Sequence, residues 1–248
     1  MQRRAFLGLV LGSAVSAVAN VKSPEDTSVW MADSDIPVFL SVCDKIENVK
    51  QIVGFGNFNI ISFDETLKVA ARYSQLDAFS AKEVEFMEKM FYEDPSQYGF
   101  YGKKTVDSIS AIIKEEDVFK VHGTGHYLFH GHSKDSFERV IKDVGDSLYL
   151  TSGVRSVVKQ MNLYFNKIKS TGGNITEAAH SLAPPAYSYH SIGDFDVGKK
   201  GWGYKNFTVS FATTREFWRL RQLSYISMRY TINNQDGVRF EPWHVKIV

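Results

Sequence analysis

Residues 188–196 read SYHSIGDFD, which places one histidine and two aspartates within seven residues. His190 and Asp196 are six residues apart, so both side chains point to the same face if the chain between them is extended. Gly193 lies between them and allows a bend or a close backbone approach. Because imidazoles and carboxylates both bind transition metals, the stretch indicates one part of a metal site.

Residues 241–244, EPWH, offer matching residue types close to the C-terminus. His244 can supply a third ligand, and Glu241 precedes it by three residues. A catalytic zinc ion needs three protein ligands, an open position for water and a base near that water. Pro242 fixes φ and removes a backbone donor, which suits a kink at the mouth of a site. Such spacings also arise by chance, so on their own they leave the site open.

Four other histidines crowd into residues 122–132, HGTGHYLFHGH. This segment is rich in glycine and alternates in polarity, which predicts a loop followed by a strand. No acidic residue nearby completes a metal shell, so we expect packing roles for these histidines. Cys43 is the single cysteine, which excludes an intrachain disulfide and a zinc site of the Cys₄ or Cys₂His₂ type.

The composition is that of an ordinary soluble globular protein. The 248 residues are 44% hydrophobic and 23% charged, which excludes a disordered chain, a collagen-like repeat and a polytopic membrane protein. The net charge of +1 argues against a phosphate-driven nucleic-acid binder. This length suits one large domain, or a catalytic domain with a smaller helical partner.

Residues 1–19 have the pattern of an export signal. Arg3 and Arg4 precede an uncharged run from Ala5 to Ala19, which is too short to span a bilayer and ends in a small-x-small cleavage pattern. The two arginines favour a twin-arginine signal over a general secretory one. We therefore predict export to a bacterial periplasm or cell envelope, with no membrane span after the signal is removed.

The pattern of the remaining chain predicts the α+β class, because helices and strands do not alternate regularly. Capping motifs predict helices that begin near Ser62, Ser80, Asp135 and Thr213, and a further helix is predicted over 157–170. Alternation predicts strands at 147–151, 207–211 and 239–248. We place a helical N-terminal region at 20–115 and a mixed domain at 116–248.

The two ligand stretches, taken together, resemble the zinc D-alanyl-D-alanine carboxypeptidases of the VanY type. Two further blocks agree with that family: TSGVRS at 151–156 with Gln160, and LAPP at 182–185. All blocks occur in the family's order over about 150–248. Val154 and Phe195 depart from the family's usual aromatic and alanine residues, and Asp194 is an additional acid. These departures concern the shape of the substrate pocket.

This resemblance implies a fold and a set of residue roles. The fold would be that of the hedgehog and DD-peptidase domains, with an antiparallel sheet flanked by helices. Zinc would be held by His190, Asp196 and His244, with Glu241 as the catalytic base. Arg155 would face the scissile carbonyl or the terminal carboxylate, and the substrate's end would be bound with the help of Gln160 and Ser188. The activity would be removal of the terminal D-Ala from peptidoglycan stem peptides.

Other functions remain open at this stage. The same ligands serve D-Ala-D-Ala dipeptidases, LD-carboxypeptidases and peptidoglycan endopeptidases. A zinc-containing wall-binding module without activity is another reading, although such a protein has no need of Glu241 as a base. A metal-free structural or wall-anchoring protein is a third.

Overall fold

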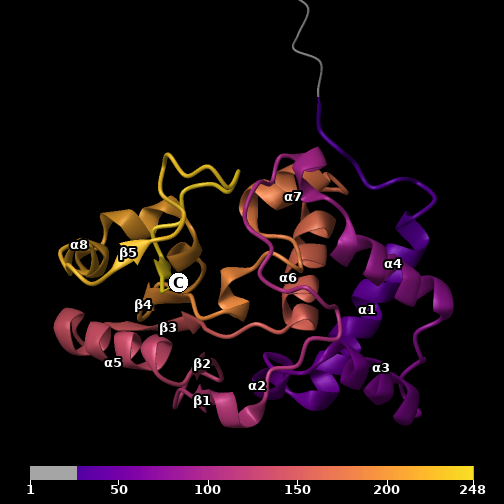
Figure 1. Cartoon of the computed structure of the whole chain (residues 1–248), viewed down its shortest axis with the longest axis horizontal. Coiled ribbons are helices and arrows are strands. Elements are labelled where there is room, and N and C mark those ends of the chain that lie inside the picture. Colours follow the sequence, from indigo (N-terminus) through magenta and orange to yellow (C-terminus); the bar gives the residue numbers. More distant parts are fainter. Residues whose placement is uncertain (1–26, 248) are drawn as a thin grey trace, which may run out of the picture.

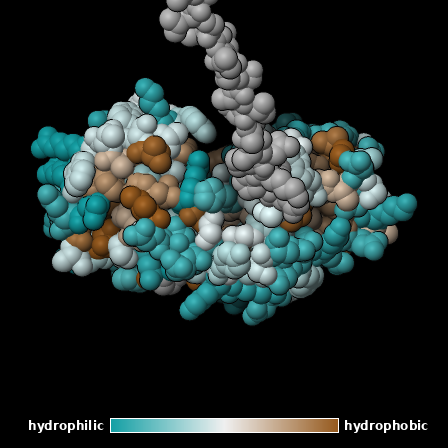
Figure 2. Space-filling model, turned by 90° about the horizontal axis from the view of Figure 1, so that it is seen from above, coloured by the Kyte–Doolittle hydropathy of each residue, from teal (hydrophilic) through white to brown (hydrophobic). Residues whose placement is uncertain are grey.

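The computed structural model of the chain describes residues 27–247. The export signal predicted at residues 1–19 therefore lies outside the described residues. Within them, none of the helices combines the length and the hydropathy that crossing a membrane requires. Figure 1 shows two halves side by side, one made of helices and one built around a sheet. The face in Figure 2 is largely hydrophilic, with small hydrophobic patches between polar side chains.

The helical half combines the N-terminal helices with two helices from the middle of the chain (Figure 1). Their bounds are α1 Ile36–Val53, α2 Phe55–Phe58, α3 Phe63–Arg72, α4 Ala81–Tyr92, α6 Val157–Ser170 and α7 Ile175–Ser181. Their apolar faces meet in one core, where Phe39 of α1 packs edge-on against Phe165 of α6. The region predicted as 20–115 therefore shares a core with α6 and α7. The domain boundary near residue 116 stays a prediction.

The second half is built on an antiparallel sheet with the strand order β3-β4-β6-β5. Its strands are β3 Leu148–Ser152, β4 Phe195–Lys199, β5 Ser227–Met228 and β6 His244–Lys246. Helices α5 His132–Val144 and α8 Arg215–Arg221 contribute to its core. Phe195, Val197 and Val245 point into that core. Because side chains alternate along a strand, Asp196 and His244 point to the opposite face.

The remaining elements are short. A small antiparallel hairpin pairs β1 Val118–Lys120 with β2 Tyr127–Phe129. The 3₁₀ turns are η1 Pro95–Tyr98, η2 Glu115–Asp117, η3 Tyr189–Ser191, η4 Gly203–Phe207 and η5 Val209–Thr213. The α+β class is confirmed, as is the antiparallel sheet flanked by helices and preceded by a helical region.

Individual elements agree with their predicted positions to different degrees. Helix α6 has the predicted bounds, and Ser80 caps α4 in a reciprocal capping box with Glu83. Helix α5 begins at His132, one turn before the predicted Asp135, because the Asp135 N–H already donates to the Gly131 carbonyl. The final strand covers only β6 instead of residues 239–248.

The strand predicted at 207–211 is wrong, because this segment forms η4 and η5. The Asn206 side chain bonds both the N–H and the carbonyl of Lys199, and so occupies backbone groups at the end of β4. The Thr208 hydroxyl accepts from the Ser210 N–H and turns the chain into η5. Side-chain hydrogen bonds of this kind favour turns over strand pairing.

The capping box of α4 gives a prediction for stability against pH. The Glu83 carboxylate accepts hydrogen bonds from Ser41, Lys45 and the Ser80 N–H. Burial opposes its charge, but these bonds outweigh burial and lower the pKa of Glu83 to about 2. A lowered pKa stabilises the fold above the unfolded value, about 4.5, and this stabilisation is lost as the pH falls towards 2.

Glu83→Gln is therefore expected to lower the free energy of unfolding at pH 7 by about 1–3 kcal/mol. The difference from the wild type should shrink as the pH falls between about 4.5 and 2. Urea denaturation at a series of pH values measures it. Glu88→Gln, at an exposed position on the same helix, is the control and should show a much smaller loss. A pH-independent loss in Glu83→Gln would contradict the account.

Candidate metal centre

Three predicted ligands meet on the face of the sheet opposite its core. Asp196 lies in β4, directly paired with His244 in β6. Directly opposed residues of antiparallel strands have side chains on the same face, which brings these two together. His190 lies in η3, so the chain between it and Asp196 is not a single extended strand. The chain turns between them at Gly193, whose φ of 131° favours glycine.

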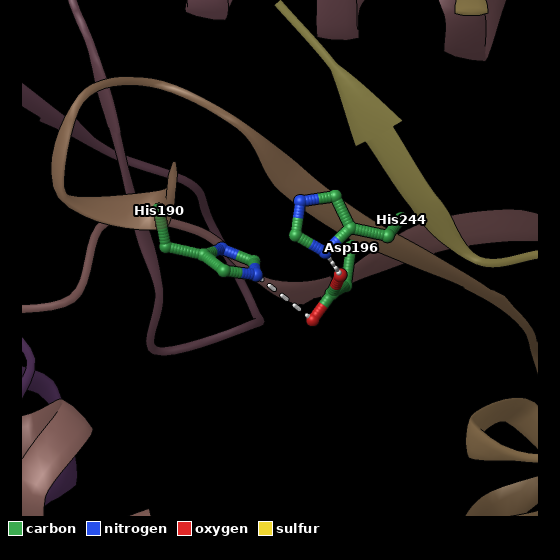
Figure 3. Close-up of side chains that lie close together, drawn as sticks. All are labelled: His190, Asp196 and His244. Atoms are coloured by element: carbon green, nitrogen blue, oxygen red, sulfur yellow. Dashed lines mark ion pairs between the residues drawn. The ribbon is translucent and has the colours of Figure 1, made fainter. Parts of the chain in front are cut away.

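The three side chains form a compact and buried group (Figure 3). One donor atom from each lies within 4.8 Å of the others. His190 Nε2 is 3.3 Å from Asp196 Oδ2, and His244 Nδ1 is 3.3 Å from Asp196 Oδ1. All three residues are at most 3% exposed, which keeps bulk water from competing for these atoms. Of the described residues, these three make up the His, Cys, Asp or Glu group able to hold a metal ion.

The hydrogen bonds of the two histidines determine which nitrogen faces the group. His190 Nδ1 is 2.9 Å from the Gly153 carbonyl, and His244 Nε2 is 3.1 Å from Asp194 Oδ2. Both partners accept, so these nitrogens carry the protons. His190 Nε2 then presents its lone pair towards Asp196, and His244 Nδ1 does so once its ring is neutral. His190 Nε2 and Asp196 Oδ1 are buried and have no hydrogen-bond partner among residues 27–247. Two imidazole nitrogens and a carboxylate with unused acceptors are a donor set that fits zinc.

Gly153 allows the backbone to support His190 closely. A Cβ at this position would lie 1.9 Å from the Tyr127 carbonyl oxygen, so no other residue fits here without a shift of the backbone. The Val154 N–H donates to the same oxygen at 2.7 Å. The end of β3 is thereby held against β2, with the Gly153 carbonyl towards His190.

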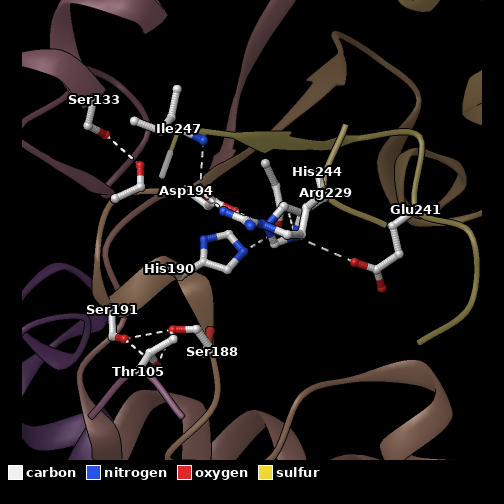
Figure 4. A network of polar contacts seen from close by, with 12 residues as sticks. Thr105, Ser133, Ser188, His190, Ser191, Asp194, Arg229, Glu241, His244 and Ile247 are labelled. Atoms are coloured by element: carbon white, nitrogen blue, oxygen red, sulfur yellow. Dashed lines mark hydrogen bonds and ion pairs between the residues drawn. The ribbon is translucent and has the colours of Figure 1, made fainter. Parts of the chain in front are cut away.

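Asp194 holds the other histidine, and the sequence reasoning recorded it only as an additional acid. Its carboxylate is fully buried and accepts from His244 Nε2, from the Arg229 guanidinium at 2.7 and 3.1 Å, and from the Ile247 N–H (Figure 4). Burial opposes the charge, but His244 and Arg229 lower the pKa of Asp194 to about 2. A carboxylate behind a metal-binding histidine fixes the ring and its tautomer. Arg229 carried no signal in the sequence, because it lies 35 residues from Asp194.

Asp194→Asn is expected to weaken zinc binding about 10- to 100-fold, as is typical for groups that orient a ligand. Competition with a chromogenic chelator measures the affinity. Ser133→Ala is a matched control, because it removes a buried hydrogen bond to the Gly193 carbonyl without touching a ligand. Equal affinities in Asp194→Asn and wild type would show that Asp194 does not orient His244.

The charges around the two histidines also favour the binding of a cation. Burial, and then the charge of Arg155, lower the pKa of His190 to about 4, so the ring is neutral at pH 7. Burial also disfavours a charged His244, but Asp194, Glu241 and Asp196 raise the pKa of His244 to about 9. These carboxylates create a negative environment that a bound cation would offset, and metal binding there would displace the His244 proton.

Glu241 lies beside the three ligands, with Oε2 3.5 Å from His244 Nδ1. It is 7% exposed, and burial raises the pKa of its carboxyl above the usual value. Its N–H donates to the Tyr230 carbonyl. The Tyr230 ring packs against the His244 ring with their centres 4.9 Å apart. Sequence reasoning missed Tyr230.

Arg155 is buried, and its guanidinium makes three hydrogen bonds. Nε donates to Ser152, Nη1 to Gln160 Oε1, and Nη2 to Asp196 Oδ2 at 2.7 Å. Arg155 therefore contacts a predicted ligand directly. Gln160 also donates to the Ala183 carbonyl at 2.6 Å, so it links Arg155 to the segment that leads into η3. Ser188 is buried at the start of η3.

The predicted site residues border one cavity of about 580 Å³. Its lining combines the three ligands and Glu241 with Arg155, Gln160 and Ser188. The structure thus brings together every predicted site residue. Phe55, His126 and Lys159 also line the cavity, and the sequence analysis assigned none of them to the site. A buried donor set at the wall of a cavity is typical of metal-dependent enzymes.

The model of one protein family matches part of the chain. The model of the VanY family, D-alanyl-D-alanine carboxypeptidase, matches residues 132–248. These residues, just under half of the chain, are similar to that family, which acts on peptidoglycan peptides ending in D-Ala-D-Ala. They hold all the ligands, Glu241 and Arg155. This similarity supports a hydrolase, as predicted from the resemblance.

Several solved structures are similar to part of the chain. The LD-carboxypeptidase LdcB is 21% identical, with 55% of this chain and 70% of that chain covered and a TM-score of 0.46. The D,D-dipeptidase VanXYg in complex with a D-Ala-D-Ala phosphinate analogue is 18% identical, with 55% and 61% covered and a TM-score of 0.44. A D,D-pentapeptidase VanY in complex with Zn(II) is 18% identical, with 53% and 78% covered and a TM-score of 0.38. A search of the curated proteins found no match.

Proposed function

We propose that the chain is a zinc-dependent carboxypeptidase that removes the terminal D-Ala from peptidoglycan stem peptides. The observation that carries this proposal is the joining of two imidazoles and one carboxylate beside Glu241, within a domain similar to the VanY family. The two unused acceptor atoms of His190 and Asp196 are buried, and zinc would satisfy both.

Zinc, when held by three protein ligands, supplies a Lewis acid and lowers the pKa of water to about 7. The ligands in this chain would be His190 Nε2, Asp196 and His244 Nδ1. Asp194 and the Gly153 carbonyl hold the two rings in the tautomers that this requires. The buried walls exclude competing water from these atoms.

Glu241 would act as the general base and then as the general acid. Its carboxylate takes a proton from the attacking water and returns that proton to the departing amine. A base works best when its pKa lies near the working pH, and burial moves the pKa of Glu241 upwards in that direction. Its position next to His244 brings the carboxylate close to the ligands.

Arg155 would both support Asp196 and stabilise the negative charge that develops on the scissile carbonyl. Its permanent charge and fixed donors suit that role, and Gln160 holds the guanidinium in place. Peptidoglycan lies outside the cytoplasm, so this function also requires the export that residues 1–19 predict.

Product masses from defined peptides test the proposal. The purified chain is incubated with a pentapeptide ending in D-Ala-D-Ala, with the corresponding tetrapeptide, and with free D-Ala-D-Ala. We expect loss of one D-Ala from the pentapeptide, abolished by a chelator and restored by zinc. Cleavage of the tetrapeptide or the dipeptide alone would instead assign an LD-carboxypeptidase or a dipeptidase. No cleavage, or cleavage insensitive to chelation, would refute the proposal.

A further inference from the structure

Lys159, in the first turn of α6, is a buried cation without an ion-pair partner in the part of the chain that the structure describes. The residue is 6% exposed and lines the same cavity as the metal ligands. Among residues 27–247 no carboxylate forms an ion pair with it. Glu47, which acts on its charge at longer range, is paired with Lys50. Burying a charge is costly unless something compensates for it.

Aromatic rings only partly compensate for this charge. Lys159 Nζ lies 5.0 Å from the centre of the Phe55 ring and 5.6 Å from that of Phe58. Burial, followed by the charge of Arg155, lowers the pKa of Lys159 to about 8, so the ammonium form still predominates at pH 7. The buried ammonium of Lys159 therefore lowers the stability of the fold. An anionic ligand bound in the cavity would supply its counter-charge.

The two arginines that line the cavity are placed differently. Arg155 directs its three nitrogens to Ser152, Gln160 and Asp196. Arg239 is only half-buried, and its charge acts on Glu241 at the catalytic side. Lys159 and His126 both pack against the Phe55 ring, so these two residues lie at the part of the cavity bordered by Phe55.

His126 adds a second polar group without a partner. It is 8% exposed, and its Nδ1 is buried and makes no hydrogen bond to any of the described residues. Its ring packs edge-on against Phe55, with the centres 5.1 Å apart. Burial, and then the charge of Lys159, lower the pKa of His126 to about 4, so the ring is neutral at pH 7. A neutral ring can donate one hydrogen bond to an anion.

We propose that Lys159, with His126 and Phe55, forms a subsite that binds a carboxylate of the peptide substrate. This inference rests on the proposed function and narrows its substrate to peptides with a free carboxylate at that place. An ammonium and a carboxylate form a charge-assisted hydrogen bond, which is strong in a site shielded from water. The carboxylate is either the C-terminus or a side-chain carboxylate of the stem peptide.

Phe55 gives the N-terminal helices a part in this subsite. It opens α2, and the loop before β2 is fastened to α2 because Asn59 donates to the carbonyls of both Phe55 and Gly125. The helical region would therefore shape one wall of the substrate cleft.

Three versions of one stem peptide test the proposal: the parent, a C-terminal amide, and a form with its side-chain carboxylates amidated. The wild type should prefer the parent over one amidated form by about 10- to 100-fold in kcat/KM. The amidated form that the wild type cleaves less efficiently identifies the carboxylate that Lys159 binds. Lys159→Met should reduce this ratio to about one, whereas Lys159→Arg should keep part of it. Lys169→Met, on the exposed side of α6, should keep the full ratio.

Two further measurements separate binding from structure and from catalysis. Thermal unfolding should show an equal or higher Tm for Lys159→Met, because the variant no longer buries an unpaired charge. Calorimetric binding of the same peptides to the zinc-loaded chain tests the subsite even if none is hydrolysed. The proposal is supported if the wild type binds the parent peptide more tightly than an amidated form and Lys159→Met does not. Equal affinities in the wild type, or the same ratio in Lys159→Met, would overturn it.

Discussion

Glu241→Gln is expected to lower kcat by about 10²–10⁴-fold, the range that general acid–base catalysis contributes. Glutamine keeps the size of the side chain but can neither take a proton from water nor return one to the amine. Zinc affinity should stay close to that of the wild type, because Glu241 lies beside the ligand set and is not part of it. Rapid-quench or steady-state assays on the D-Ala-D-Ala pentapeptide measure the loss.

The pH profile gives this prediction a second readout. Burial raises the pKa of Glu241, and only its carboxylate form accepts a proton. The kcat/KM of the wild type should therefore rise with pH through that pKa, and the residual activity of Glu241→Gln should lack this limb. Glu216→Gln is the control, because Glu216 is a buried glutamate on α8 that does not line the cavity. Undiminished kcat in Glu241→Gln would reject the base assignment.

Arg155→Met should have the second largest effect, with a fall in kcat/KM of about 10²–10³-fold. The same change should lower the free energy of unfolding of the metal-free protein by about 3–5 kcal/mol, because it breaks a buried ion pair with Asp196. The loss should be smaller with zinc bound, since the ion then offsets the charge of Asp196. Urea denaturation with chelator or with zinc measures both values.

Arg155→Lys separates the effect of the guanidinium's hydrogen-bond geometry from the effect of its positive charge. A lysine keeps the charge but cannot donate to Ser152, Gln160 and Asp196 from one rigid plane. We therefore expect it to restore little of the activity. Full activity in Arg155→Lys, or the same stability loss with and without zinc in Arg155→Met, would show that the geometry of the guanidinium has no special role.

The sequence predicted the elements whose signals are local. Helix α6 and the cap at Ser80 follow from residues within one helical turn. The strand predicted at 207–211 failed because alternation cannot reveal that Asn206 bonds to Lys199 instead. In the site, the three metal-ligand candidates and Glu241 came from two short stretches together with a family resemblance.

Residues that act through tertiary contacts could not be predicted in this way. Arg229 reaches Asp194 only because β5 lies beside β6 in the sheet. Lys159 is a helix residue next to Gln160, and the sequence does not show that its ammonium is buried without a carboxylate. Phe55 borders the cavity because α2 packs against the loop before β2. Each of these contacts joins segments that are distant in the chain.

The central claim is that His190, Asp196 and His244 hold one zinc ion. The most direct test is the metal content of the purified chain after dialysis against zinc, measured by mass spectrometry and compared with His190→Ala and His244→Ala. The account predicts one tightly bound zinc per wild-type chain, and none in either variant at the same free zinc concentration. A folded wild-type chain without stoichiometric zinc, or variants that retain it, would contradict the account.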